Sequence, residues 1–110
     1  MKFGLKEMNT NLSEHKIQEL ILDWLKLNGY FVWRNNVGFK GHVHYGLKGS
    51  SDILGIATSD KSFGRFLAIE VKDHNGVVSE EQQKFIDAVN DHGGIAFVAR
   101  SLGEVVEYLK

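Results

Sequence analysis

The stretch FLAIEVK, residues 66–72, decides the expected fold. Side chains alternate between the two faces of a strand, so the leucine, isoleucine and valine at 67, 69 and 71 share one face. Phe66 and Ala68 share the other face with Glu70 and Lys72. A run this apolar is typical of a central strand, buried on both faces. Since Glu70 and Lys72 are about 6–7 Å apart along the strand, we expect an acid and a base side by side at its end.

The flanking sequence predicts a single α/β domain over 13–110, preceded by an arm over 1–12. Hydrophobic periodicity, β-branched runs and glycine punctuation place its elements. We expect helices over 13–28, 79–92 and 101–109, and strands over 30–33, 52–57, 65–72 and 95–99. The second and third strands, joined by a polar turn over 58–64, indicate a hairpin. The helix over 79–92 makes a crossover, which joins parallel strands. The order αβββαβα therefore predicts a central mixed sheet flanked by helices.

Smaller signals refine this arrangement. Ser79 with Gln82, and Ser101 with Glu104, have the capping-box form that opens a helix. Trp24 and Trp33 are expected in the core. Four glycines and no clear periodicity over 34–51 predict a long exposed loop, and long loops of this kind are often functional.

The composition limits the class of protein. The 110 residues, 43 % apolar and 25 % charged, are typical of one globular domain. The chain has no cysteine, which excludes a disulfide scaffold and a thiolate metal site and fits a cytoplasmic protein. No apolar run is long enough to span a bilayer, so we expect no membrane association.

The charge distribution is more informative than the net charge of −1. No acidic residue lies between Asp23 and Asp52, whereas lysines, an arginine and two histidines do. This stretch is either a solvated basic loop or a phosphate-binding surface, and composition leaves both readings open. His42 and His44 lack a third metal ligand nearby, which favours a surface loop. The candidates for DNA contact are Arg34, Lys40, Tyr45 and Lys48.

Asp52 is expected beside Glu70 and Lys72, because in a hairpin the start of one strand lies beside the end of the other. Two clustered carboxylates repel each other unless a cation lies between them. Mg²⁺ suits such a site, since it takes a few carboxylate oxygens and keeps several waters. We therefore expect Asp52 and Glu70 to bind Mg²⁺, with Lys72 orienting a water or stabilising charge on a phosphate.

Two further residues have both a functional and a structural reading. Glu14 lies at the edge of the apolar stripe formed by Ile17 and Ile21, where it could add a carboxylate to the site. As a first-turn acid it also favours the helix dipole. Gln82 could belong to the site or only complete the capping box with Ser79.

These motifs resemble the VRR-NUC branch of the PD-(D/E)XK nuclease superfamily. The likeness lies in the helix with Glu14, in Gly49-x-x-Asp52 within GSSDILGI, in Glu70-x-Lys72 within AIEVKDHNGVVSEEQ, and in GGIAFVARSLGEVVEYL. It spans about residues 13–109, and it departs from the family where Ser51 replaces a frequent proline. It implies a restriction-endonuclease-like fold and metal-dependent phosphodiester cleavage. It also implies Asp52 and Glu70 as metal ligands with the Val71 carbonyl, Lys72 as the catalytic lysine, and Glu14 and Gln82 as further site residues.

The resemblance also implies a substrate class and an assembly. Stand-alone members of this branch are similar to Holliday-junction or other structure-specific endonucleases that act as homodimers on branched DNA. Mg²⁺ is the implied cofactor, and Mn²⁺ is expected to substitute. One alternative stays open: a non-catalytic module that binds nucleic acid or protein and retains the nuclease fold, as the near-neutral charge and short chain suggest.

Overall fold

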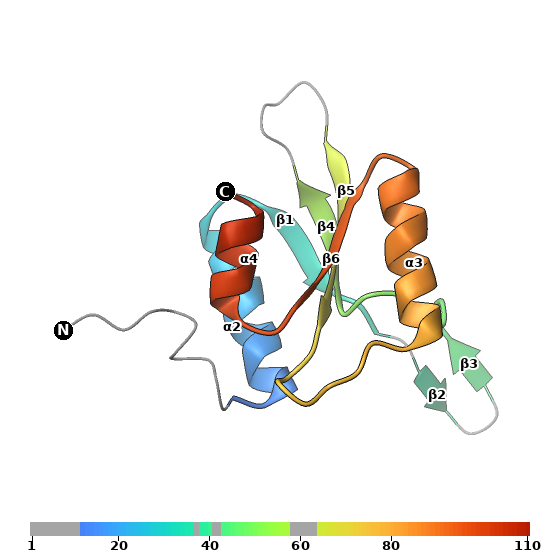
Figure 1. The fold of residues 1–110 in the computed structure, drawn as a ribbon. Helices are drawn as coiled ribbons and strands as arrows, with labels where there is room; N and C mark the ends of the chain where they lie inside the picture. The colour runs from blue at the N-terminus through green and yellow to red at the C-terminus, as the bar shows by residue number, and fades with distance from the viewer. Residues whose placement is uncertain (1–11, 37, 41–42, 58–63) are drawn as a thin grey trace.

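The computed structural model describes residues 12–36, 38–40, 43–57 and 64–110, and for 38–40 and 43–45 it describes the backbone. Its elements follow one another along the chain as Figure 1 shows. They are α2 (Glu14–Leu27), β1 (Phe31–Arg34), β2 (Gly38–Lys40), β3 (Val43–Tyr45), β4 (Ile53–Ala57), β5 (Arg65–Val71), α3 (Glu80–Asp91), β6 (Ile95–Ala99) and α4 (Leu102–Tyr108).

A four-stranded mixed sheet forms the centre of the fold, in the order β1-β4-β5-β6. β4 pairs antiparallel with both β1 and β5, while β6 lies parallel to β5 after the crossover through α3. The predicted hairpin, crossover and mixed sheet are therefore confirmed. So is the central position of the strand that carries Glu70.

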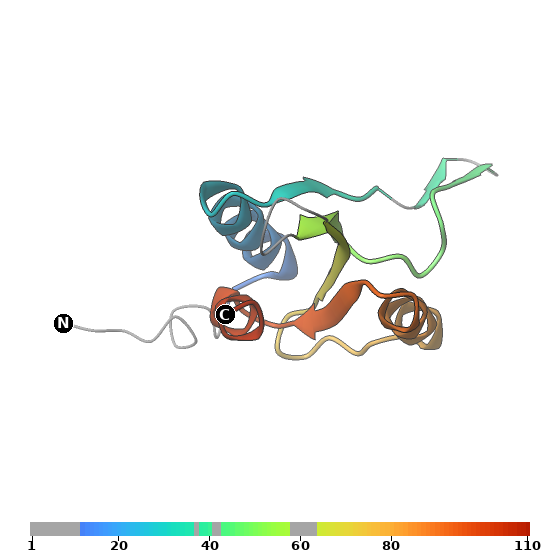
Figure 2. The same ribbon diagram turned by 90° about the horizontal axis from the view of Figure 1, so that it is seen from above.

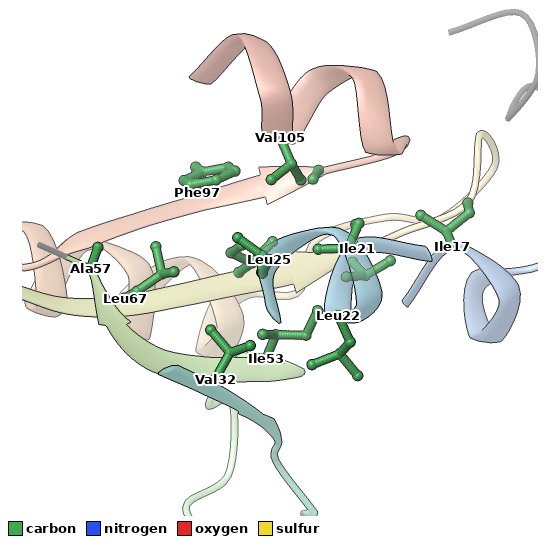
Figure 3. Close-up of a cluster of buried hydrophobic side chains, with 13 residues drawn as sticks. Ile17, Ile21, Leu22, Leu25, Val32, Ile53, Ala57, Leu67, Phe97 and Val105 are labelled. Carbon is green, nitrogen blue, oxygen red and sulfur yellow. The ribbon is translucent and has the colours of Figure 1, made fainter. Parts of the chain in front are cut away.

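The helices cover the two faces of the sheet unequally. α2 and α4 lie on one face and α3 on the other (Figures 1 and 2). The larger core lies under α2 and α4 (Figure 3). There, apolar residues of α2 pack on the face of β5 that carries Leu67, Ile69 and Val71. Its fully buried members include Ile17, Ile21, Leu25, Ile53, Leu67, Ile69, Val71 and Val105.

The core under α3 is smaller and leaves part of its sheet face open. Ala68, Ile86 and Ala96 form it. Trp33 is 42 % exposed on β1, with its ring tilted against that of Phe31. The prediction that Trp33 lies in the core is therefore wrong, because α3 packs on β5 and β6 and does not reach β1. Trp24 does pack against the larger core.

The loop predicted over 34–51 is also partly wrong. β2 and β3 pair antiparallel within it, with Phe39 opposite His44. Strands of three residues are too short to show the period of two in the sequence. The expected arm over 1–12 lies outside the described residues except for Leu12, which packs against the core, and residues 58–63 of the expected turn also lie outside them. In the part of the chain that the structure describes, no helix has the length and apolar character needed to cross a bilayer.

The two predicted capping boxes differ. Ser79 accepts from the Gln82 N–H at 3.1 Å, and the Gln82 side chain accepts from the Ser79 N–H at 2.9 Å, so this box is complete. Ser101 accepts from the Glu104 N–H, but the Glu104 carboxylate accepts from the Arg100 N–H at 2.6 Å. Ser101 therefore caps α4 without a reciprocal bond, and Glu104 instead holds the chain one residue earlier.

Replacing Ile21 by alanine tests the packing of α2 on the sheet. Ile21 is fully buried in the larger core, so Ile21→Ala is expected to lower the free energy of unfolding by about 2–5 kcal/mol. Urea unfolding followed by circular dichroism measures the loss. Leu27→Ala on the same helix is the control, since Leu27 is 86 % exposed and its loss should change stability by less than about 0.5 kcal/mol. Equal losses in the two variants would contradict this packing.

Candidate active site

Glu70 is a buried acid near the end of β5, with 2 % of its surface exposed. It lies on the α3 face of the sheet, since Ala68 two residues earlier packs in the core under α3. Glu70 Oε2 accepts a hydrogen bond from Gln82 Nε2 at 3.1 Å and lies 3.6 Å from Lys72 Nζ. Glu70 Oε1 is buried without a hydrogen-bond partner among the described residues. Because a buried polar atom without a partner is costly, this oxygen indicates a ligand site.

Asp52 lies across from Glu70. β4 and β5 pair with Ile53 opposite Ile69, so the same register continued by one residue places Asp52 opposite Glu70. Asp52 Oδ2 accepts a hydrogen bond from the Val71 N–H at 2.8 Å. The hairpin thus brings together the two acids that lie 18 positions apart in the sequence.

Burial controls the charge of this acid pair. Burial raises the pKa of Glu70 to about 8, and Asp52 adds to the rise through its charge and by accepting a hydrogen bond from the protonated form of Glu70. The Lys72 ammonium acts in the opposite direction but does not outweigh them. Without a cation, Glu70 therefore holds a proton at neutral pH. A cation that binds there must displace it.

Lys72 and Gln82 both contact Glu70 Oε2. Lys72 is 9 % exposed, so its ammonium is held inside the site and not in bulk solvent. Gln82 uses both ends of its amide: the oxygen accepts from the Ser79 N–H, and the nitrogen donates to Glu70. The two readings of Gln82 are therefore compatible, because the helix cap holds the side chain that binds the acid.

Glu14 reaches the same site from the start of α2. Partial burial raises the pKa of Glu14, and the Asp52 carboxylate raises it further, while Lys72 lowers it. The Asp73 N–H also bonds to Glu14 and lowers its pKa. These interactions require Glu14 to lie near Asp52 and Lys72, so its first-turn position does not exclude a role in the site.

Asn35, which the sequence did not single out, holds the segment before Asp52. The Asn35 N–H donates to the Asp52 carbonyl at 2.8 Å, and the Asn35 side chain donates to Ser50 and Ser51. Gly49 has φ +85°, and a Cβ there would lie 2.6 Å from the Glu81 carbonyl oxygen. Asn35 follows β1, and asparagine at the end of a strand is a turn signal that could have indicated this role.

The donor atoms at this site fit a magnesium ion. Among the described residues, no three histidine, cysteine or acidic side chains are grouped closely enough to hold a metal. Mg²⁺ does not need three, because one or two carboxylates and several waters commonly hold it. Asp52 and Glu70 supply two carboxylates. The Val71 N–H donates to Asp52. Because the N–H and C=O groups of one strand residue point to the same side of the strand, the Val71 carbonyl also faces Asp52. This carbonyl offers a third oxygen.

Of the residues predicted to contact DNA, Arg34 lies away from the acid pair. Arg34 pairs with Ile53, whose side chain lies in the core under α2, so Arg34 lies on the opposite sheet face from Glu70. There Arg34 lines a cavity of about 340 Å³ with Glu19 and Asp23. Lys48 is exposed in the turn before Gly49. The structure does not describe the side chains of Lys40, His42, His44 and Tyr45.

The raised pKa of Glu70 predicts how stability depends on pH. Between pH 4.5 and about 8 the folded protein keeps a proton that the unfolded chain releases. The free energy of unfolding of the metal-free protein therefore falls as pH rises through this window, by at most about 1.4 kcal/mol per pH unit from this group. Glu70→Gln removes this contribution, so the variant should gain stability relative to the native protein from pH 5 to 8 in urea unfolding.

The control for this measurement is Glu107→Gln, which replaces an exposed carboxylate on α4. Its stability difference from the native protein should stay nearly constant over the same range. Taking differences removes the contribution of other groups that titrate there. A difference for Glu70→Gln that does not change between pH 5 and 8 would contradict the burial of a protonated Glu70.

Comparison with known proteins identifies the family of this chain. A family model of the VRR-NUC domain matches residues 12–102. A solved structure described as a VRR_NUC domain protein has a TM-score of 0.63 and 21 % sequence identity, over 89 % of this chain and 85 % of that chain. This likeness shows a shared fold. A search of the curated proteins found no match. Because the family model covers most of its length, the chain belongs to the VRR-NUC domain family and has the restriction-endonuclease-like fold of a nuclease domain.

Proposed function

We propose that this protein is a Mg²⁺-dependent endonuclease that hydrolyses phosphodiester bonds in branched DNA. One observation carries the proposal: Glu70 is buried beside Asp52 and Lys72, with one carboxylate oxygen unpartnered among the described residues. A structural ion pair alone would not account for the unpartnered oxygen or for a second acid opposite it. The nuclease fold of the family supports the same conclusion.

Asp52, Glu70 and the Val71 carbonyl are the groups that would hold Mg²⁺, and Mn²⁺ is expected to substitute. When bound, the ion supplies a water of lowered pKa and polarises the phosphodiester. Gln82 orients the Glu70 carboxylate through the bond to Oε2. Glu14 lies near enough to Asp52 to hold a further water or a proton.

Lys72 is the hydrogen-bond donor to a water or to the phosphate in this proposal. Its ammonium lies 3.6 Å from Glu70 Oε2 and is nearly buried, so it can donate to a water or a phosphate oxygen without first losing a full hydration shell. A preorganised donor of this kind stabilises charge that develops on the phosphate in the transition state. The attacking water gives up its proton during the reaction, and Glu14, which is not a proposed metal ligand, is the nearby acid available to receive it.

We extend the proposal to the assembly and the location. Two copies related by a dyad match a two-fold symmetric junction. The stretch without acids between Asp23 and Asp52 supplies basic residues for the phosphates, with Lys40, Tyr45 and Lys48 as candidates. Arg34 is a weaker candidate because it lies on the far face. DNA as substrate and the absence of cysteine suit a cytoplasmic enzyme.

Cleavage of a synthetic four-way junction beside a linear duplex of the same sequence, with Mg²⁺ or Mn²⁺, tests the proposal. We expect paired symmetric nicks in the junction. Lys72→Met should lower the rate by about 10²–10³-fold, because it removes a preorganised donor. Asp52→Asn and Glu70→Gln should lower it at least as far, because each removes a proposed metal ligand.

The matched controls are Lys84→Met and Asp87→Asn, which make the same changes on the exposed side of α3 and should keep full activity. Junction binding by gel shift separates the alternatives. A metal-loaded protein that binds DNA and cleaves none, with binding unchanged by Asp52→Asn, would establish the non-catalytic module instead. Equal cleavage of junction and duplex would overturn the substrate class.

A further inference from the structure

The turn that follows β5 lies directly on Lys72. A Cβ added to Gly76 would lie 3.0 Å from Lys72 Cδ and 3.1 Å from Lys72 Cβ, so the backbone of the turn packs against the aliphatic stem of the lysine. This packing contributes to the low exposure of Lys72, at 9 %. The position of the turn therefore decides where the lysine stem can lie.

Within the described residues few bonds hold the turn in this place, beyond the Asp73 N–H that faces Glu14. The Gly76 N–H donates to the Asp73 carbonyl at 3.2 Å, and the Asn75 N–H donates to Asp73 Oδ1 at 2.9 Å. Both bonds are internal to residues 73–76, so they define the shape of the turn and not its place. The ladder between β5 and β6 ends just before it, with the Lys72 N–H donating to the Ala99 carbonyl.

Arg100 attaches both ends of the turn to the chain just after β6. Its Nη1 donates to the Asp73 carbonyl at 2.7 Å and to the Gly76 carbonyl at 2.8 Å, one acceptor at each end of the turn. Hydrogen bonds from a charged donor are stronger than neutral ones. Arg100 is itself held, because its N–H donates to the Glu104 carboxylate at 2.6 Å at the start of α4.

We propose that Arg100 is a positioning residue for the reaction: it holds the 73–76 turn over Lys72 and so holds the lysine ammonium against Glu70. Arg100 directly follows β6 and acts only through the turn. The inference rests on the proposed nuclease function for its catalytic consequence. Its structural part, the protection of Lys72 by the turn, is independent of any activity.

Lysine acylation measures that structural part. The protein is treated briefly with N-hydroxysuccinimidyl acetate, and the modification of each lysine is followed by peptide mass spectrometry. Lys84, at 73 % side-chain exposure, is the internal reference. In Arg100→Met the ratio of Lys72 to Lys84 labelling should rise several-fold above that of the native protein. Arg100→Lys should give an intermediate ratio, because lysine keeps the charge but lacks the length of the arginine side chain and the fixed donor directions of its guanidinium.

Arg65 offers a matched control. Like Arg100, it donates to two backbone carbonyls of a turn, those of Gly93 and Gly94, but at the other end of the sheet. Arg65→Met should leave Lys72 labelling and junction cleavage as in the native protein. Should Arg100→Met fail to fold, the pair Arg100→Lys and Arg65→Lys carries the same comparison.

Junction cleavage measures the catalytic part. A misplaced catalytic group costs about 10²-fold in rate, so Arg100→Met should lower kcat by about that factor, with little change in the Kd for the junction. Unchanged Lys72 labelling in Arg100→Met would overturn the positioning role, whatever the activity. Raised labelling with an unchanged kcat would overturn its importance for the reaction. If Arg100→Met raises Lys72 labelling but the native protein cleaves no DNA, the result would support the positioning of Lys72 by Arg100 and overturn the proposed function.

Discussion

The burial of one carboxyl group is the constraint on which the site depends. Glu70 lies on the central strand, under α3, with 2 % exposure, and its Oε1 has no partner within the described residues. Burying a charged acid in this way is unfavourable, and the pKa of Glu70 is raised for that reason. A stable small domain tolerates such a group when it serves a purpose, and here the neighbouring groups are a second acid and a lysine.

The architecture explains how so small a protein gathers these groups. The antiparallel pairing of β4 and β5 brings Asp52 opposite Glu70, and the crossover through α3 brings the Gln82 amide onto the same carboxylate. The parallel partner β6 delivers Arg100 to the turn beyond Lys72. Each element of the sheet thus contributes to the site at the same end of the fold. The larger core under α2 and α4 stabilises the other face of the sheet, where the described core residues are hydrophobic.

Much of this could be predicted from the sequence because the signals are local. The alternation over 66–72 identified the central strand and its faces, and Ser79 with Gln82 marked the start of α3. The hairpin between β4 and β5 followed from two strands and a short polar turn, and it placed Asp52 near Glu70. These features depend on residues a few positions apart, where periodicity and capping chemistry are strong.

Other features depend on tertiary packing and were not predictable. Trp33 is exposed because α3 covers only part of its sheet face, and no pattern within β1 reports how far a helix reaches. β2 and β3 are too short to show a period. Arg34 lies away from the acid pair because of the register of β1 against β4. Arg100 binds carbonyls 24 and 27 positions earlier in the chain, a relation that only the folded sheet creates.

The central claim is that Asp52 and Glu70 form a divalent-cation site. Crystals soaked in Mn²⁺ and measured for anomalous scattering test it most directly, since the ion is then located without reference to any activity. We expect one anomalous peak per chain, between the two carboxylates and within bonding distance of Glu70 Oε1 and the Val71 carbonyl. A Mn²⁺-saturated crystal without a peak there, with Glu70 still bonded only to Gln82 and Lys72, would contradict it.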